Sequence, residues 1–271
     1  VVLVNTNSFE ESDIRQIAPK NCFIMAWDGF VKPLVQKNKS YDLILTCLDA
    51  IQYTYQKIGT ASEILHFAFD PRVLDFVDTH KSETCTFSGS ISPVHQSRLD
   101  FLYQLTQAPI DFKLYLGNYD TGYNPFSRTI LREIIQNKNF KNLLKVYQLQ
   151  QDNHKGGWGL DMYKILARSV STLNFHGDEV AKACNIRLFE ATGLGTCLVT
   201  DNKPGLEEFY IKDEEVVTFE HINDLIDKLI YLEKNPKIAA SIGQAGKNKI
   251  FTSHLWEHRT KQLIEIIHKH I

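Results

Sequence analysis

The chain has 271 residues, with 30 lysines and arginines against 32 aspartates and glutamates, which gives a formal net charge of −2. Hydrophobic residues make up 43% of the chain and charged residues 23%, so the composition excludes a disordered chain or a coiled coil. The near-neutral charge lacks the basic excess of a duplex nucleic-acid binder, and no apolar run approaches the roughly 20 residues that would span a bilayer. We expect a globular protein of one large or two ordinary domains.

Short apolar segments rich in β-branched and aromatic residues alternate along the chain with amphipathic patterns. They predict strands at Val1–Val4, Cys22–Ala26, Leu43–Cys47, Ile64–Phe67, Cys85–Ser88, Phe112–Leu116, Leu144–Tyr147, Ser171–Phe175, Cys197–Thr200 and Glu215–Phe219. The amphipathic patterns predict helices at Gln96–Leu105, Arg128–Gln136, Leu160–Arg168, Asn185–Thr192, Ile222–Glu233, Pro236–Phe251 and His254–His270. This alternation is typical of an α/β fold, in which parallel sheets are covered by helices on both faces.

The polar segment Val77–Glu83 has no periodicity and is the expected break between two sheets. We predict a first domain over residues 1–80, a second over 81–252 and a closing helix over 253–271 that packs back toward the first domain. Because the chain opens directly on a predicted strand, we expect the first domain to be truncated at its N-terminus, with preceding residues or companion domains missing. The five cysteines are widely spaced in apolar runs, as buried thiols of a cytoplasmic protein are.

The first candidate site is the segment SGSISPVHQSR, which follows a predicted strand and opens a predicted helix. Gly89, Ser90 and Ser92 lie where main-chain N–H groups can meet an anion with the support of the helix dipole. Arg98 lies further along the helix and would reach a phosphate group. An ordinary strand–turn–helix connection explains the same residues, and the segment lacks the spacing of a Walker loop or a dinucleotide fingerprint.

The second candidate site is the segment NFHGDEVAKACNIRLFEATGLGTCLVTD, in which a strand ends, a helix follows and another strand begins. In open α/β sheets ligands bind outside the carboxyl ends of strands, and Asn174 and His176 lie at such an end. Arg187 falls in the first turn of the helix, where an anionic ligand would offset its conflict with the helix dipole. The alternatives are that Asn185 is simply an N-cap and that Arg187 simply pairs with Glu190.

A family resemblance emerges from these residues. The stretch from GWGLDMYKILARSVSTLNFHGD through NIRLFEATGLGTCLVTDNKPGLEEFYIKDEEVVTF resembles the donor-binding domain of nucleotide-sugar glycosyltransferases. It is most similar to the group that resembles the spore-maturation protein CgeB, of the glycosyl transferases group 1 type. FSGSISPVHQSR is similar to the glycine loop of that group. The resemblance covers nearly the whole chain and is strongest from Gly157 to Arg259.

The resemblance implies the GT-B fold, two facing Rossmann-like domains with a nucleotide-sugar between them. Related retaining enzymes carry a Glu-x₇-Glu pair whose second glutamate binds the ribose hydroxyls. Glu190 occupies that second position, and Lys182 stands at the first, which leaves open whether the anomeric configuration is retained. Without an Asp-x-Asp motif, stabilisation of the leaving diphosphate need not involve a metal ion, so we expect no cofactor besides the donor substrate.

Other residues have a functional and a structural interpretation. Asp28 and His66 are candidate catalytic groups, although a turn aspartate before glycine and a packed strand histidine are the plainer explanations. Trp158 could lie near the base or serve as a packing anchor. We predict a glycosyltransferase that moves sugar from a nucleoside-diphosphate donor to a glycan, lipid-linked or protein acceptor. An epimerase or phosphorylase on the same fold, or a non-catalytic nucleotide-binding module, are the alternatives.

Overall fold

The computed structural model describes residues 1–5, 11–29, 41–91, 96–117, 140–178 and 180–271. The chain divides into two compact units. The first unit is Val1–Ala68 with Trp256–Ile271, and the second is Phe69–Leu255. The sequence-based division is at residues 80 and 252, whereas the two units divide after Ala68 and after Leu255. Among the described residues, no helix is long and apolar enough to cross a membrane.

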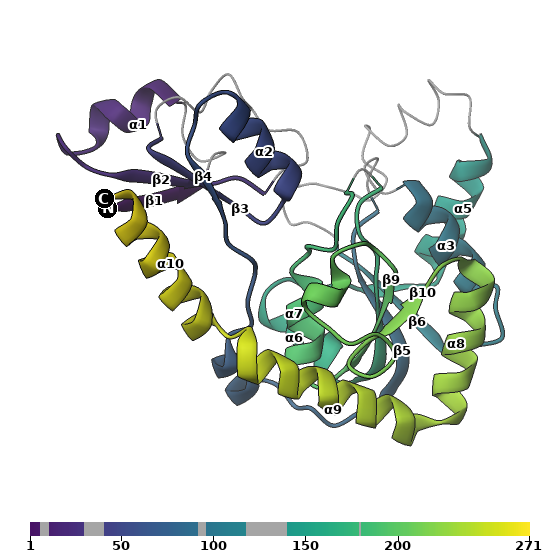
Figure 1. The fold of residues 1–271 in the computed structure, drawn as a ribbon. Helices are drawn as coiled ribbons and strands as arrows, with labels where there is room; N and C mark the ends of the chain where they lie inside the picture. The colour runs from purple at the N-terminus through teal and green to yellow at the C-terminus, as the bar shows by residue number, and fades with distance from the viewer. Residues whose placement is uncertain (6–10, 30–40, 92–95, 118–139, 179) are drawn as a thin grey trace. The chain divides into compact units, whose positions relative to one another are not determined.

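The first unit is built on a parallel sheet that keeps the order of the chain (Figure 1). Its strands are β1 (Val2–Asn5), β2 (Ile24–Trp27), β3 (Leu43–Thr46) and β4 (Ser62–Ile64). Helices α1 (Glu11–Ile17) and α2 (Asp49–Lys57) accompany one face, where Ile24 and Ile44 pack with Ile51 and Tyr55 of α2. Successive strand residues point to opposite faces, so Met25 and its neighbours form a second apolar cluster on the other face.

Helix α10 (Trp256–His270) covers that second face, which Figure 1 shows as the yellow helix beside the sheet. Its Ile266 packs with Met25, and Arg259 Nε donates to the main-chain oxygen of His66 at 3.1 Å. Near the end of the helix, Lys269 pairs with Glu63 at 2.6 Å. The last helix of the chain therefore belongs to the same unit as the first strands.

The second unit contains a parallel sheet in the order β10-β9-β8-β5-β6-β7. Its strands are β5 (Glu83–Gly89), β6 (Phe112–Leu116), β7 (Asn153–Lys155), β8 (Ser169–Asn174), β9 (Cys197–Asp201) and β10 (Val217–Phe219). Its helices are η2 (Pro71–Phe76), α3 (Gln96–Thr106), α5 (Phe140–Gln151), α6 (Leu160–Ala167), α7 (Arg187–Gly193), η4 (Leu206–Glu208), α8 (Ile222–Lys234) and α9 (Pro236–Ser253). When its strands are numbered in chain order from β5, the sheet has the strand order of a Rossmann fold.

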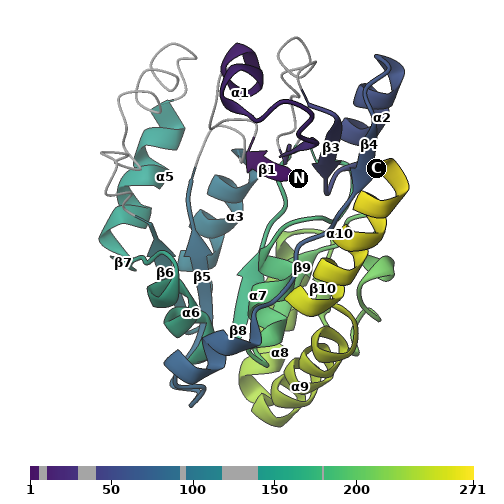
Figure 2. The same ribbon diagram turned by 90° about the vertical axis from the view of Figure 1, so that its left-hand side faces the viewer.

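Different helices cover the two faces of this sheet. The side-by-side helices α3 and α5 (Figures 1 and 2) share the main apolar core with α8, through leucines such as Leu102, Leu149 and Leu229. Helices α6, α7 and α9 contact one another and the sheet as a second group. Gly195 (φ +73°) forms the turn between α7 and β9, and a Cβ on Gly243 of α9 would lie 2.4 Å from its carbonyl oxygen.

The predicted strand Leu144–Tyr147 is wrong, because these residues lie inside helix α5. Its apolar run is the face of a helix: Val146 and Leu149, three positions apart, are both buried against the sheet. The short strand β7 was not predicted, since its sequence NHK is polar and it forms by pairing with β6. The predicted helix Arg128–Gln136 lies outside the described residues.

Candidate functional site

The sheet of the second unit has a topological switch point between β5 and β8. The chain leaves β5 toward β6 and β7 on one side, and β8, β9 and β10 follow on the other. Connections that leave in opposite directions open a crevice outside the carboxyl ends of the two central strands, where open α/β sheets bind ligands. Here β5 ends at Gly89 and β8 at Asn174.

A cavity of about 200 Å³ lies at this switch point, and we call it the switch-point cavity. It is lined by residues from both predicted segments, namely Gly89, Ser90, Arg98, Asn174, Asn185 and Arg187. Trp158 and Ile186 also line it and keep 59% and 43% of their surfaces exposed. The cavity therefore combines two guanidinium groups with a large exposed aromatic ring.

Arg98 is held at the ends of the two central strands. Its Nη1 donates to the main-chain oxygen of Ser90 and its Nη2 to that of Phe175, both at 2.8 Å, and its guanidinium lies over the Phe87 ring. These carbonyl partners carry no net charge, so they fix the direction of the side chain and do not neutralise it. Only 8% of this residue is exposed, and it forms part of the cavity wall.

Arg187 is partly buried at the start of α7, with 15% of its side chain exposed, and its Nη2 donates to the main-chain oxygen of Ser88 at 3.1 Å. Its Nη1 forms an ion pair with Oε2 of Glu190 at 3.1 Å, although neither atom has a hydrogen-bond partner among the described residues. The hydroxyl of Tyr163 also interacts with the carboxyl group of Glu190. Burial lowers the pKa of Arg187 and raises the pKa of Glu190, in each case against the attraction between the two charges. The sequence offered this pair as a surface alternative, but in the structure Glu190 is buried and only 15% of the Arg187 side chain is exposed.

Glu190 itself does not line the switch-point cavity, whereas Arg187 does. Tyr163 was not predicted as a site residue, and no sequence motif singles it out, because it lies in α6, well before the predicted segment. Burial, together with the carboxylate of Glu190, raises the pKa of the Tyr163 hydroxyl, which keeps this group a hydrogen-bond donor.

A chain of amides supports the second wall of the cavity. Asn185 Nδ2 donates to Oδ1 of Asn174 at 2.7 Å, and Asn174 Nδ2 donates to the Thr200 hydroxyl at 2.9 Å. The Oδ1 of Asn185 also accepts from the main-chain N–H of Leu188 at 3.3 Å, although the N-cap position of α7 is Ile186 and not Asn185. These bonds tie β8, β9 and the start of α7 together.

His176 lies beyond this chain and does not line the cavity. Its Nδ1 and main-chain N–H both contact Oδ1 of Asp201, at 2.7 and 3.1 Å, and its side chain is 1% exposed. Burial would raise the pKa of Asp201, but the hydrogen bonds and charge of His176 lower it further than burial raises it. The pair therefore joins the ends of β8 and β9.

The remaining predicted site residues lie elsewhere. Ser92 lies outside the described residues. Asp28 follows β2 in the first unit, where it is 1% exposed and accepts a hydrogen bond from the Tyr55 hydroxyl at 2.5 Å. His66 is partly buried in the same unit, after β4. Among the described residues, no group of three histidine, cysteine, aspartate or glutamate side chains could hold a metal ion.

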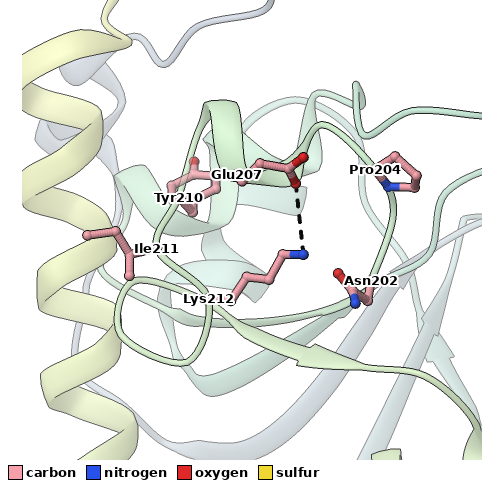
Figure 3. Close-up of a pocket in the computed structure, with 6 residues that line it drawn as sticks. All are labelled: Asn202, Pro204, Glu207, Tyr210, Ile211 and Lys212. Carbon is pink, nitrogen blue, oxygen red and sulfur yellow. Dashed lines mark ion pairs between the residues drawn. The ribbon is translucent and has the colours of Figure 1, made fainter.

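A second hollow, of about 630 Å³, lies beside η4 in the second unit (Figure 3). Figure 3 shows Lys212 pointing toward Glu207, with which it pairs at 3.8 Å, and Asn202 and Pro204 on the opposite loop. The two opposite charges in this hollow compensate each other. Although it is larger, it lacks the two guanidinium groups of the switch-point cavity, which we take as the candidate site for an anionic ligand.

The fold has known counterparts among solved structures of low sequence identity. Sucrose-phosphate synthase from Thermosynechococcus elongatus is 12% identical, with a TM-score of 0.63 over 95% of this chain and 70% of that one. The Anabaena protein HepE in complex with UDP-glucose is 12% identical, with a TM-score of 0.65 over 91% of this chain and 72% of that one. TarM is 14% identical, with a TM-score of 0.60 over 97% of this chain and 54% of that one. No curated protein matches the sequence.

These neighbours place the chain in the GT-B class of α/β proteins, as the sequence predicted. The chain belongs to the glycosyl transferase-like family, whose profile matches residues 100–265, more than half of its length. Sugar transfer is therefore the general activity that the family and the fold support.

Proposed function

We propose that this protein binds a nucleoside-diphosphate sugar in the switch-point cavity and transfers the sugar to a glycan, lipid-linked or protein acceptor. The observation that carries the proposal is the pair of guanidinium groups at the switch point of a Rossmann sheet, from the buried Arg98 and the partly buried Arg187. A diphosphate is the anion that such a pair suits, because guanidinium groups bind phosphate oxygens with charge-assisted hydrogen bonds.

The same two arginines would also promote cleavage of the bond between the sugar and the diphosphate. When the sugar departs, negative charge builds on the diphosphate, and cations held in place beforehand stabilise that charge without reorganising. We assign this work to Arg98 and Arg187, with Gly89 and Ser90 beside them in the cavity wall and no metal ion required. Ser92 stays a prediction from the sequence. Asp28 and His66 stay predictions for the group that acts on the acceptor.

The exposed ring of Trp158 supports a place for the nucleobase at the rim of the cavity. The indole nitrogen lies 3.5 Å from where a Cβ on Gly117 would be, so the ring stands over a chain segment without side-chain bulk. Aromatic rings of this kind stack on any nucleobase. We place the base against Trp158 and the ribose between the base and the two arginines.

Two narrower assignments complete the proposal. Within the family, we place the chain near the group that resembles CgeB. We also assign it to the cytoplasm, because all five of its cysteines are free thiols. Burial raises the pKa of Cys85 and Cys197 to about 12, which makes these two thiols unreactive.

The test is a binding titration of the protein with UDP and UDP-glucose, chosen because the HepE structure holds UDP-glucose, with GDP and ADP beside them. A ligand at 100 times its Kd raises the unfolding free energy by about 2.7 kcal/mol, which a thermal-shift assay detects. Arg98→Met should lose this shift, and Arg72→Met, at an exposed arginine of the same unit, should keep it. A wild-type protein that binds none of these nucleotides contradicts the proposal.

Product analysis separates the transferase from its alternatives. A transferase slowly hydrolyses its donor and releases the nucleoside diphosphate, whereas an epimerase converts the donor without an acceptor and keeps the sugar attached to the nucleotide. Binding with neither reaction, in the presence of a panel of acceptors, indicates a non-catalytic nucleotide-binding module.

A further inference from the structure

Lys81 lies at the amino ends of the strands of the second unit, at the opposite end of the sheet from the switch-point cavity. It precedes β5, which begins at Glu83 and reaches the cavity at Gly89. Its Nζ donates to the main-chain oxygen of Ala167 and to the hydroxyl of Thr196, both at 2.8 Å. Ala167 is the last residue of α6 and Thr196 immediately precedes β9, so this lysine connects three elements of the unit.

The two acceptors satisfy an uncharged amine but not a charged one. A neutral amine has two N–H groups, and Ala167 and Thr196 accept both, which leaves its lone pair pointing away from them. An ammonium group has a third N–H, for which the described residues offer no acceptor. The Thr196 hydroxyl donates its own hydrogen to the main-chain oxygen of Leu166 at 2.7 Å, so it can only accept from Lys81. The geometry therefore suits the nucleophilic form of the side chain.

A second lysine, Lys247 of α9, lies beside this site. Its Cδ is 3.4 Å from where a Cβ on Gly195, the residue before Thr196, would be. Among the described residues, the titratable groups that face Lys81 are Lys247 and the thiol of Cys197, and no carboxylate offsets the two positive charges. Burial and the charge of Lys247 lower the pKa of Lys81 from 10.5 to about 8, against a smaller opposite effect of Cys197.

We propose that Lys81 is an acylation site, at which its amine attacks the carbonyl carbon of a small acyl phosphate while the ammonium group of Lys247 attracts the phosphate. In this step the C–N bond forms, the bond from the carbonyl carbon to the phosphate oxygen breaks, and phosphate leaves with that electron pair. The amine nitrogen loses one proton to water. Enzymes activate lysine nucleophiles in the same way, by desolvation or by a neighbouring cation.

The product of this reaction suits the site better than the charged lysine does. An acylated lysine has no charge, so acylation removes the cost of holding two cations together where burial disfavours them. Its amide N–H still donates to one of the two acceptors, and the new carbonyl oxygen is an acceptor for Lys247. A Schiff base with an aldehyde would carry a positive charge when protonated, so the site favours acyl transfer.

The experiment incubates the folded protein with acetyl phosphate at pH 7 and measures acetylation of each lysine by quantitative peptide mass spectrometry. Lys164 is the reference, because it belongs to the adjacent helix α6 and its side chain is 53% exposed. A pKa of about 8 leaves about 300 times more neutral amine at pH 7 than a pKa of 10.5 does. Because partial burial slows the reagent and lower basicity weakens the nucleophile, we expect Lys81 to react about ten-fold faster than Lys164.

The unfolded protein separates the effect of the structure from that of the local sequence. In urea the contacts with Ala167 and Thr196 are lost, so Lys81 should react about ten-fold more slowly than in the folded protein and at a rate similar to that of Lys164. In the folded protein, the rate at Lys81 should also level off above about pH 8, whereas in urea it should keep rising.

Lys247→Gln tests the neighbouring cation. It removes the charge and keeps a polar side chain, so acetylation of Lys81 at pH 7 should slow by about three- to ten-fold, because less of the amine is neutral and the phosphate is no longer attracted. Lys237→Gln is the matched control, since Lys237 is an exposed lysine in the first turn of the same helix. It should leave the rate at Lys81 unchanged.

A rate at Lys81 in the folded protein that is no higher than that at Lys164 overturns the inference. So does a rate at Lys81 that is the same in Lys247→Gln as in the wild type. If Lys247→Gln does not fold, the pH dependence of the wild type decides, and a rate that keeps rising well above pH 8 in the folded protein overturns the inference.

Discussion

Two clusters in the second unit use the same three kinds of side chain. The Glu190 cluster, which consists of Tyr163, Arg187 and Glu190, has its counterpart in the Glu83 cluster, which consists of Glu83, Tyr115 and Arg168. In the Glu83 cluster the Tyr115 hydroxyl donates to the carboxylate at 2.6 Å and accepts from Arg168 at 2.9 Å. Lys113 adds a second cation 3.6 Å from the carboxylate. Every member therefore contacts another member directly.

The arginines of the two clusters differ in how well their charges are compensated. The pKa of Arg168 is raised, because its contacts with Tyr115 and Glu83 together exceed the opposing effect of burial. The pKa of Arg187 is lowered, because burial exceeds the attraction of Glu190 and Tyr163. An arginine whose charge is under-compensated gains more from an additional anion. On the proposed function, the same residue types stabilise the fold in one cluster and serve ligand binding in the other.

The largest expected effect follows from removing each arginine. Arg187→Met leaves a buried carboxylate without its cation, which should lower the unfolding free energy by about 3–5 kcal/mol and abolish UDP binding. Arg168→Met leaves Glu83 beside Lys113, so we expect a smaller loss, about 1–3 kcal/mol, and unchanged UDP affinity. Chemical denaturation and titration calorimetry measure the two quantities.

A double variant separates stability from binding in the Glu190 cluster. Arg187→Met combined with Glu190→Leu replaces the buried pair by apolar side chains, a change that is often neutral or stabilising. The double variant should recover much of the lost stability and still fail to bind UDP. If it bound UDP as well as the wild type does, the contrast between the two clusters would have no functional meaning.

The next largest expected effect is the loss of UDP affinity when Trp158 is replaced. This residue lines the same cavity as Arg187 but belongs to neither cluster. Removal of a stacking ring costs about 1–3 kcal/mol of binding per base, so Trp158→Ala should weaken UDP binding roughly five- to 150-fold. The residue is 59% exposed, so the melting temperature should change little. Trp158→Phe should restore part of the affinity.

Pyrophosphate is the control ligand for Trp158, because it has no base to stack. Its affinity should be equal in the wild type and in Trp158→Ala, whereas Arg187→Met should weaken it. Equal losses for UDP and pyrophosphate in Trp158→Ala would mean that the ring supports the phosphate site and does not contact the base.

The sequence allowed the residues at strand ends to be predicted, but not the partners that reach them from other elements. Asn174 was predicted because it lies at a strand end, Arg98 because its helix follows a glycine loop, and Arg187 because it opposes a helix dipole. The parallel topology brings all three to one cavity. Tyr163 was missed because its role depends on how α6 packs against α7. Whether Glu190 lines the cavity depends on side-chain direction, which a motif does not specify.

The same distinction holds for the fold. Most strands were predicted because apolar runs with β-branched residues are buried on both faces, as β9 is. Strand β7 was missed because it has no apolar signal, and Leu144–Tyr147 was misassigned because a short apolar run has no clear period. The central strands could therefore be predicted from local composition, whereas the edge strand β7 depends on its pairing with β6.

The smallest expected effect concerns Asp201, whose pKa lies below its usual value of 3.8 because its bonds to His176 outweigh burial. A carboxyl group with a lowered pKa stabilises the fold above its unfolded-state pKa, and this stabilisation is lost as the pH falls through the folded-state value. One such group contributes a slope of at most about 1.4 kcal/mol per pH unit. Asp201→Asn should therefore flatten the fall in unfolding free energy below about pH 4.

Urea denaturation of wild type and Asp201→Asn from pH 3 to pH 7 measures this slope. Because His176 and Asp201 join the ends of β8 and β9 behind the cavity, UDP affinity at neutral pH should change much less than in Arg187→Met. Parallel stability curves for the two proteins would show that the bond between His176 and Asp201 contributes nothing to acid sensitivity. A loss of UDP affinity as large as that of Arg187→Met would instead place His176 and Asp201 with the Glu190 cluster.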